Sequence, residues 1–363
     1  MKTPRRVFVT DCEGPVSKND NAFELTSHFV PNGETLFTQI SRYDDVLADV
    51  VRRKGYQAGD TLKLVLPFLK AYDVTDEKIA SFSAKNILLM PGAKETLQSV
   101  RAVMPAFIVS TSYEHYLRAL CSTLGFPYED TYCTRLSLDA YRISSKEKKQ
   151  LKRLGQEICA MQLLEIPEKA VSLRMLSEKT QQTIRRFDEI FWDEIMQLES
   201  GTIIREVNPV GGVEKAEAAR KVAAENGCAL DSVMYVGDSI TDVECFRLLR
   251  ETGGLTVSFN GNSYAVREAD IAVLSPNAMI IAVLADVFNR LGHDAIYGLT
   301  DDWSYSAMEK HGVDPSLRER MRGLFRRNLP EMSKIRAGNV DAVAAESSAF
   351  RKLVRGEKVG SLG

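Results

Sequence analysis

The sequence predicts an α/β fold: a mostly parallel, Rossmann-like doubly wound sheet with helices on both faces. Apolar segments that suit buried strands occur at 5–10, 106–111 and 232–237, and each ends in polar or acidic residues. Segments with helical spacing of apolar residues lie between them, for example at 93–103 and 214–226. Strands that alternate with helices form parallel sheets through right-handed crossovers. We therefore expect the polar strand ends to meet at one edge of the sheet, where such sheets bind ligands.

Further strands are expected at 255–260 and 271–274, and weaker strand candidates occur at 202–207 and 136–138. The tail beyond residue 291 is expected to be helical, including 315–327 and 339–354. At 363 residues the chain is long for one domain, so additional modules are expected. We predict a core at 1–17, 86–142 and 202–295, a helical cap at 18–85, a helical insertion at 143–201 and a helical C-terminal extension at 296–363.

The composition excludes several classes of protein. Hydrophobic residues make up 44% of the chain and charged residues 26%, as in ordinary globular proteins. The net charge of −2 creates no field that would attract nucleic acid or an acidic membrane. The six cysteines form no CxxC pair, which argues against a zinc site and fits a reducing compartment. No apolar run approaches the ~20 residues of a membrane helix. We therefore expect a cytoplasmic protein without membrane or nucleic-acid partners.

The polar ends of the strands carry groups suited to phosphoryl chemistry. Carboxylate oxygens suit Mg²⁺, which takes one or two protein carboxylates together with substrate phosphate. A hydroxyl and an ammonium suit phosphate oxygens, and an aspartate can form an aspartyl-phosphate. These groups follow three strands and begin one helix: Asp11 and Glu13, Ser110 and Thr111, Asp238 and Asp242, and Lys215.

Each residue also has a purely structural alternative. Asp11 and Glu13 could be loop carboxylates that cap a helix. Asp238 and Asp242 could be a helix N-cap and a first-turn acid, a role that is compatible with metal binding. Lys215 alone could be a surface lysine. The joint pattern favours an active site, because each residue falls at the predicted end of a strand or start of a helix.

Four segments in order resemble the motifs of the haloacid dehalogenase superfamily of phosphohydrolases: DCEGP, IVST, GGVEKAEAARKV and VGDSITD. The resemblance implies that Asp11 is the nucleophile and that Glu13 is the general acid and base. It implies a Mg²⁺ ion held by the Asp11 side chain, the Glu13 backbone carbonyl and the Asp238 side chain. Phosphate binding would fall to Ser110 and Lys215, with Thr111 beside them, and Asp242 would support the metal and the lysine.

Within the superfamily, the segment LTVSFNGNSYAVREADIAV resembles the closing part of phosphoserine phosphatases, which implies a supporting role for Asn260 and a substrate-binding role for Asp20. The chain differs from that type at several positions. Glutamate replaces aspartate at position 13, and the insertion at 143–201 is extra. The arginine that holds the substrate carboxylate is missing, and only Lys63 stands in the matching segment, so phosphoserine itself is not supported as substrate.

The DCEGP and NDNAFEL segments also resemble a related family in methanogens, the R subunit of energy-converting hydrogenase A. Our functional prediction does not depend on that narrower family. We expect a Mg²⁺-dependent phosphohydrolase that cleaves a phosphate monoester of a small metabolite through an aspartyl-phosphate. Two alternatives remain open at this point: a phosphotransferase or phosphomutase on the same scaffold, and a non-catalytic assembly protein.

Overall fold

The computed structural model describes residues 5–167 and 170–362. Its centre is a seven-stranded sheet with the order β3-β2-β1-β4-β5-β6-β7. Six strands are parallel, and β7 runs antiparallel to β6 at one edge. The predicted mostly parallel α/β fold is therefore confirmed. The strands are β1 (Val7–Thr10), β2 (Ala106–Tyr113), β3 (Thr131–Thr134), β4 (Val233–Gly237), β5 (Leu255–Phe259), β6 (Ile271–Leu274) and β7 (Glu331–Lys334).

Helices cover both faces of this sheet, because alternate residues of each strand point to opposite sides. Phe8 of β1 belongs to one apolar cluster, while Val7 and Val9 belong to another. The first cluster includes buried residues of α5, α6 and α13, and the second includes those of α10 and α11. These helices are α5 (Ala93–Arg101), α6 (Glu114–Leu124), α10 (Gly212–Glu225), α11 (Val243–Thr252) and α13 (Met279–Leu291), and the short α12 (Ser263–Glu268) precedes β6.

The order of the strands places a topological switch point between β1 and β4. From β1 the chain continues to β2 on one side, and from β4 it continues to β5 on the other. Open α/β sheets bind ligands outside the carboxyl ends of the strands at such a point. Asp11 follows β1 and Asp238 follows β4, so both side chains start at this position.

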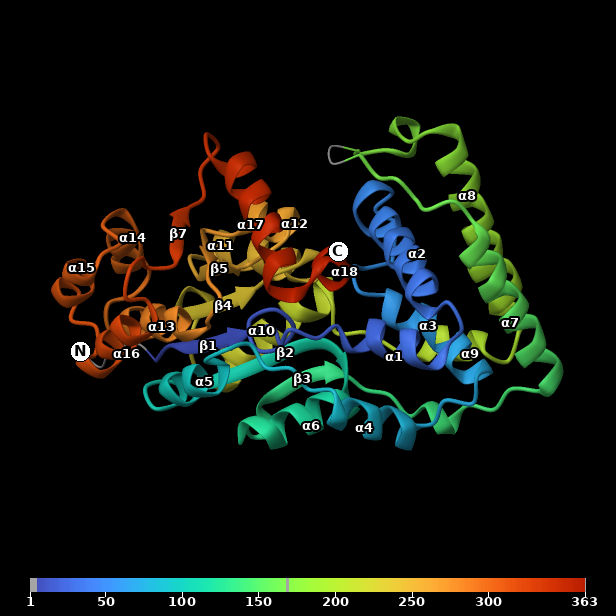
Figure 1. The fold of residues 1–363 in the computed structure, drawn as a ribbon, viewed down its shortest axis with the longest axis horizontal. Coiled ribbons are helices and arrows are strands. Elements are labelled where there is room, and N and C mark those ends of the chain that lie inside the picture. Colours follow the sequence, from blue (N-terminus) through green and yellow to red (C-terminus); the bar gives the residue numbers. More distant parts are fainter. Residues whose placement is uncertain (1–4, 168–169, 363) are drawn as a thin grey trace.

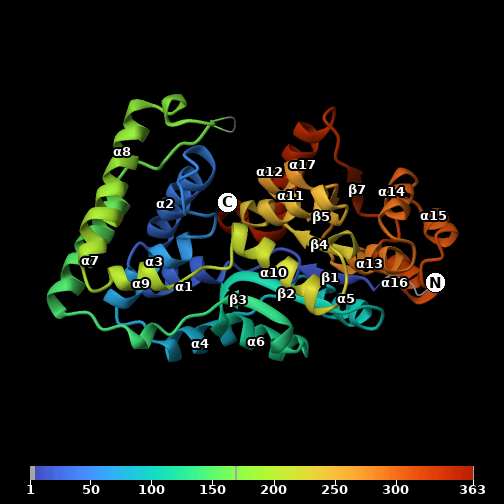
Figure 2. The ribbon, with the colours of Figure 1, turned by 180° about the vertical axis from the view of Figure 1, so that it is seen from behind.

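A separate helical layer lies beyond that edge of the sheet (Figures 1 and 2). Segments from two distant parts of the chain share one apolar cluster within it. The Tyr43 ring stacks on Phe187 with the ring centroids 4.9 Å apart and on Phe191 at 5.8 Å. The layer contains α1 (Asn21–Phe29), α2 (Gly33–Asp45), η1 (Val46–Val50) and α3 (Thr61–Ala71) from the first part, and α7 (Ser145–Ala160), α8 (Glu178–Asp188), η5 (Glu189–Glu194) and α9 (Gly201–Glu206) from the second. Helix α4 (Asp76–Lys85) packs against α6 of the core.

The C-terminal part of the chain wraps the far edge of the sheet and then returns towards the helical layer (Figure 1). Its last residues reach that layer, where Leu362 joins the apolar cluster. No helix within the described residues is long and apolar enough to cross a membrane. The elements of this part are α14 (His293–Asp301), α15 (Tyr305–Lys310), α16 (Pro315–Leu324), β7, α17 (Val340–Arg355) and α18 (Glu357–Gly360).

Three local predictions were wrong. The strand candidate at 202–207 is helix α9, because its apolar residues, four apart at Ile203 and Val207, pack into the helical layer. The candidate at 136–138 forms no strand, because Leu136 and Leu138 pack into the same layer after the edge strand β3 has ended. The tail is not wholly helical, because it contributes strand β7. The only buried residue of β7 is Met332, so the sequence of this strand lacks a clear apolar alternation.

The stacked rings of the helical layer lead to a stability prediction. Phe187→Ala removes a fully buried ring from the contact with Tyr43. We expect a loss of about 3–5 kcal/mol in the free energy of unfolding, measured by denaturant titration with tryptophan fluorescence. Val171→Ala is the control, because Val171 is 69% exposed. A Phe187→Ala loss below ~1 kcal/mol would contradict a shared core between the two parts of the layer.

Candidate functional site

Asp11 lies directly after β1 at the edge of the sheet that faces the helical layer. Its backbone N–H donates to the carbonyl of Val236 over 2.8 Å, which ties the end of β1 to β4. The carboxylate is buried, and its Oδ1 accepts a hydrogen bond from the backbone N–H of Cys12 at 2.6 Å. The other oxygen, Oδ2, faces the start of α10.

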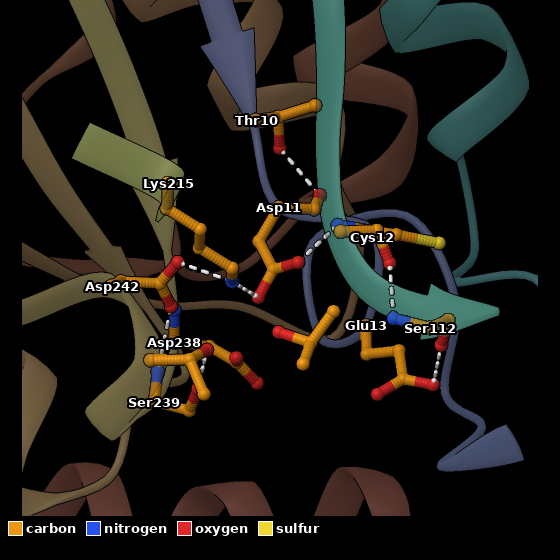
Figure 3. A network of polar contacts seen from close by, with 12 residues as sticks. Thr10, Asp11, Cys12, Glu13, Ser112, Lys215, Asp238, Ser239 and Asp242 are labelled. Atoms are coloured by element: carbon orange, nitrogen blue, oxygen red, sulfur yellow. Dashed lines mark hydrogen bonds and ion pairs between the residues drawn. The ribbon is translucent and has the colours of Figure 1, made fainter. Parts of the chain in front are cut away.

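Lys215 occupies the first turn of α10 and is completely buried. Its Nζ lies 2.7 Å from Asp11 Oδ2 and 2.8 Å from Asp242 Oδ1 (Figure 3). Burial lowers the pKa of this ammonium, but the charges of Asp11 and Asp242 outweigh that effect and raise it above its ordinary value. Lys215 is therefore charged and joins two carboxylates that lie far apart in the sequence.

Asp242 is held by donors on both of its oxygens. Oδ1 accepts from Lys215 and from the hydroxyl of Tyr235 at 2.9 Å. Oδ2 accepts from the backbone N–H groups of Asp238 and Ser239 at 2.9 and 3.0 Å. Four donors therefore hold the buried Asp242 carboxylate in one orientation.

Asp238 extends from the end of β4 and completes a group of three buried carboxylates. One oxygen each from Asp11, Asp238 and Asp242 lies within 4.8 Å of the others. Gly14 packs against the same group: a Cβ there would lie 2.0 Å from Asp238 Oδ2, and its φ of +98° favours glycine. The backbone after Glu13 therefore lies directly against the Asp238 carboxylate.

Glu13 lies on the opposite side of Asp11 from Lys215 (Figure 3). Its Oε1 accepts hydrogen bonds from Ser112 Oγ at 2.6 Å and from the backbone N–H of Asn21 at 3.0 Å. Burial, and then the negative charge of Asp20, raise the pKa of Glu13 to about 7 against the opposing charge of Arg355. A carboxyl group of this kind can both donate and accept a proton near neutral pH.

A small cavity of about 70 Å³ lies beside Asp11, Glu13 and Asp238. Residues from the predicted core, the predicted cap and the predicted C-terminal extension line it together. The core contributes Asp11, Glu13, Thr111, Asp238, Ser239, Ile240 and Thr241, the cap contributes Asp20, Phe37, Ser41, Asp44, Asp45, Gly59, Thr61 and Leu62, and the extension contributes Arg351, Arg355 and Leu362. The site is therefore enclosed by three segments that are distant in sequence.

Several predicted residues do not line this cavity, and these include Lys215 and Asp242, which pair with each other beside Asp11. Ser110 is buried outside the set of lining residues, and its Oγ accepts a hydrogen bond from the backbone N–H of Ser112 at 3.1 Å. Asn260 pairs with Ser275 in the turn after β5. Lys63 forms an ion pair with Asp60 at 2.7 Å, outside the set of lining residues.

Sequence analysis missed most of the residues that line the cavity, and it also missed four side chains that bond to the predicted carboxylates: Tyr235, Ser112, Arg351 and Arg355. Tyr235 and Ser112 are ordinary strand residues, and nothing in their local sequence marks them. Arg351 did carry a signal, because it falls on the same face of its helix as the buried residues Ala344 and Ser347. A cation on the buried face of an amphipathic helix requires a buried partner.

The fold and this group of carboxylates and a lysine define a Rossmann-like α/β protein with an acidic site at the switch point of its sheet, and comparison with known proteins identifies the family. The sequence model of the haloacid dehalogenase-like hydrolases matches residues 101–285, which is half of the chain. The chain belongs to this family. The match does not distinguish the narrower hydrogenase-associated family, and that resemblance stays a prediction.

Comparison with solved structures finds one with the same fold and weaker similarity to others. The structure of gene product AF1437 from Archaeoglobus fulgidus has 28% sequence identity, covers 99% of this chain and 99% of that chain, and superposes with a TM-score of 0.81. Phosphoserine phosphatase in its apo form has 15% identity, covers 76% of this chain and 97% of that chain, and gives a TM-score of 0.46. A phospho-aspartyl intermediate analogue of phosphoserine phosphatase gives 15% identity, 77% and 97% coverage, and 0.44. No curated protein sequence matches the chain.

The hydroxyl of Tyr235 leads to a prediction about the buried charges. Tyr235→Phe removes one donor from Asp242, and hydrogen bonds to charged groups contribute about 1.5–3 kcal/mol. We expect a loss of that size in the free energy of unfolding. Tyr116→Phe is a matched control, because the Tyr116 hydroxyl donates to the neutral Asn19 Oδ1 and is expected to cost about 1 kcal/mol. Equal losses in the two variants would show that the hydrogen bond of Tyr235 to Asp242 is no stronger than one to a neutral amide.

Asp44, on the cap side of the cavity, leads to a prediction about pH. Burial, and then the charge of Asp60, raise the pKa of Asp44 to about 7. The folded state therefore keeps a proton that the unfolded state releases near pH 4, so this contribution to stability is present below about pH 4 and is lost as the pH rises through about 7. The full loss in the free energy of unfolding is on the order of 4 kcal/mol.

Urea unfolding at pH 5 and pH 8 measures this effect. The wild-type protein is expected to lose more stability between the two pH values than Asp44→Asn, which cannot ionise. The comparison uses the change with pH within each protein, so an altered hydrogen bond to Gly59 in the variant does not affect it. An identical pH dependence in both proteins would show that Asp44 does not carry the raised pKa.

Proposed function

We propose that the protein is a phosphohydrolase that cleaves a phosphate monoester of a small metabolite through an aspartyl-phosphate on Asp11. The observation that carries the proposal is the contact of Lys215 Nζ with Asp11 Oδ2 at 2.7 Å, inside a group of three buried carboxylates at the switch point of the sheet. Phosphoryl transfer depends mainly on positioning and on neutralising charge. The site supplies a carboxylate, a fixed ammonium and a second carboxyl group suited to proton transfer.

In the first step, a carboxylate oxygen of Asp11 attacks the phosphorus, and the bond from phosphorus to the ester oxygen breaks. Glu13 gives its proton to the departing oxygen, which its raised pKa of about 7 permits. Lys215 offsets negative charge beside Asp11. In the second step, Glu13 accepts a proton from water while the water oxygen attacks the phosphorus, which releases inorganic phosphate and restores Asp11.

The residues present fit a divalent cation. Three carboxylate oxygens converge within 4.8 Å, and the absence of a Cβ at Gly14 lets the backbone after Glu13 lie against Asp238. We propose that the side chains of Asp11 and Asp238 and the backbone carbonyl of Glu13 would hold Mg²⁺. The ion would supply neutralisation of charge on the phosphoryl oxygens.

The enclosure of the site supports a small substrate. The cavity of about 70 Å³ beside Asp11 is covered by the cap and the C-terminal extension. A larger cavity of about 950 Å³ adjoins it, and Asp45, Ile240 and Leu362 line both. The reacting group would therefore lie in the inner cavity, and an extended protein chain would not reach Asp11.

Hydrolysis of 4-nitrophenyl phosphate tests the proposal. With Mg²⁺ we expect turnover by the wild-type protein, a loss of at least ~10³-fold in kcat for Asp11→Asn, and loss of activity when EDTA removes the metal. Asp294→Asn, an exposed carboxylate on α14, is the matched control and should retain full activity. Activity that survives in Asp11→Asn would exclude Asp11 as the nucleophile. A wild-type protein without activity on aryl and alkyl phosphates would contradict the proposed function.

A further inference from the structure

Helix α17 brings two arginines to the site from the far end of the chain. The side chains of Arg351 and Arg355 are each only 3% exposed, and both form ion pairs with Asp238 Oδ2. Helix α17 and the following α18 run towards the helical layer at the carboxyl edge of the sheet (Figures 1 and 2). Among the residues that the structure describes, these two are the only Lys or Arg side chains that line the inner cavity.

Arg355 is engaged through all three of its nitrogens. Nη1 lies 3.0 Å from Asp238 Oδ2, Nε donates to the carbonyl of Lys18 at 3.2 Å, and Nη2 donates to the carbonyl of Asn19. These bonds fasten the end of α17 to the segment that follows β1. The contacts of Arg355 are therefore explained by its role in holding α17 against the core.

Arg351 is engaged through one nitrogen. Its hydrogen bonds within the described part of the chain all come from Nη1 and go to the carbonyl and carboxylate of Asp238. Its Nε is buried and has no hydrogen-bond partner. A buried donor of a charged group is costly when it is unpaired, and guanidinium groups are suited to bind carboxylates and phosphates with two parallel bonds. Docking of the helix leaves this donor unexplained.

We propose that Arg351 binds a second anionic group of the substrate, so that the substrate is a small phosphate ester that also carries a carboxylate or a second phosphate. This inference rests on the proposed function, since it takes the phosphoryl group to lie at Asp11. Arg351 and Asp11 line the same cavity of about 70 Å³, so only a short chain can separate the two anionic groups. The acidic residues that otherwise surround the cavity would repel such a group everywhere except beside the arginines.

The competing explanation is that Arg351 only orients Asp238. The two explanations differ in what the removal of Arg351 changes. If Arg351 only orients Asp238, its removal weakens the binding of all phosphate esters to the same extent and also weakens the binding of Mg²⁺. A residue that binds the second anion affects esters that carry one much more than esters that lack it.

Calorimetry on the Asp11→Asn protein with Mg²⁺ separates these explanations without turnover. The three probes share a three-carbon skeleton: glycerol 3-phosphate has one anionic group, 3-phosphoglycerate adds a carboxylate, and glycerol 1,3-bisphosphate adds a second phosphate. We expect addition of Arg351→Ala to weaken binding of at least one of the two-anion probes by roughly 10- to 100-fold and that of glycerol 3-phosphate by less than ~3-fold. The two-anion probe that loses more identifies the class of the second group as carboxylate or phosphate.

Two variants control the measurement. Arg351→Lys keeps the positive charge but loses the planar guanidinium that can form two parallel hydrogen bonds, so partial recovery of binding is expected. Lys358→Ala removes an exposed cation of the same C-terminal segment that pairs with Glu34 outside the cavity, and binding should not change. Equal weakening of all three probes, or no weakening of either two-anion probe, would overturn the proposal.

Steady-state kinetics distinguish this inference from the proposed function. In the otherwise wild-type protein, the ratio of kcat/KM for the preferred two-anion probe to that for glycerol 3-phosphate should fall at least 10-fold in Arg351→Ala. Circular dichroism and unfolding curves confirm that the variant is folded. Turnover with an unchanged ratio would overturn the role of Arg351 alone. Selective binding without any turnover would support the role of Arg351 and contradict the proposed function.

Discussion

The site depends on the buried ammonium of Lys215 between Asp11 and Asp242. Two carboxylates this close together inside a protein would repel each other strongly, and each buried charge costs several kcal/mol unless it is paired and hydrogen-bonded. Here every partner is present, since Asp242 also accepts from Tyr235 and from two backbone N–H groups. One side chain therefore joins the ends of β1 and β4 to the start of α10.

The strand order explains why these groups meet where they do. β1 lies between β2 and β4, and the connections from β1 and β4 leave in opposite directions. Asp11 and Asp238 follow β1 and β4, and Thr111 and Ser112 lie near the end of β2, so these residues meet at this edge of the sheet. Close packing completes the arrangement, because a Cβ at Gly237 would lie 2.4 Å from the Cγ of Asp242. Glycine is required there for the carboxylate to reach its donors.

The site is enclosed by segments that lie far in the sequence from the residues at the strand ends. The cap and the insertion act as one layer because they share an apolar core around Tyr43, Phe187 and Phe191. The C-terminal extension then connects this layer to the sheet. Leu362 packs into the layer, while Arg355 holds α17 against the segment after β1. Residues of the cap and of the C-terminal extension line the inner cavity, so both must be in place to exclude water from it.

The sequence by itself determined the α/β class, five of the seven strands and the polar groups at the strand ends, because these features depend on the spacing of neighbouring residues. Asp11, Asp238 and Asp242 could be expected at one edge for that reason. Only the tertiary structure decided that 202–207 is a helix and that β7 exists, because their packing partners lie elsewhere in the chain. The same holds for Arg351 and Arg355: their partner Asp238 lies more than a hundred residues away, and burial against it is a non-local property that no short sequence pattern records.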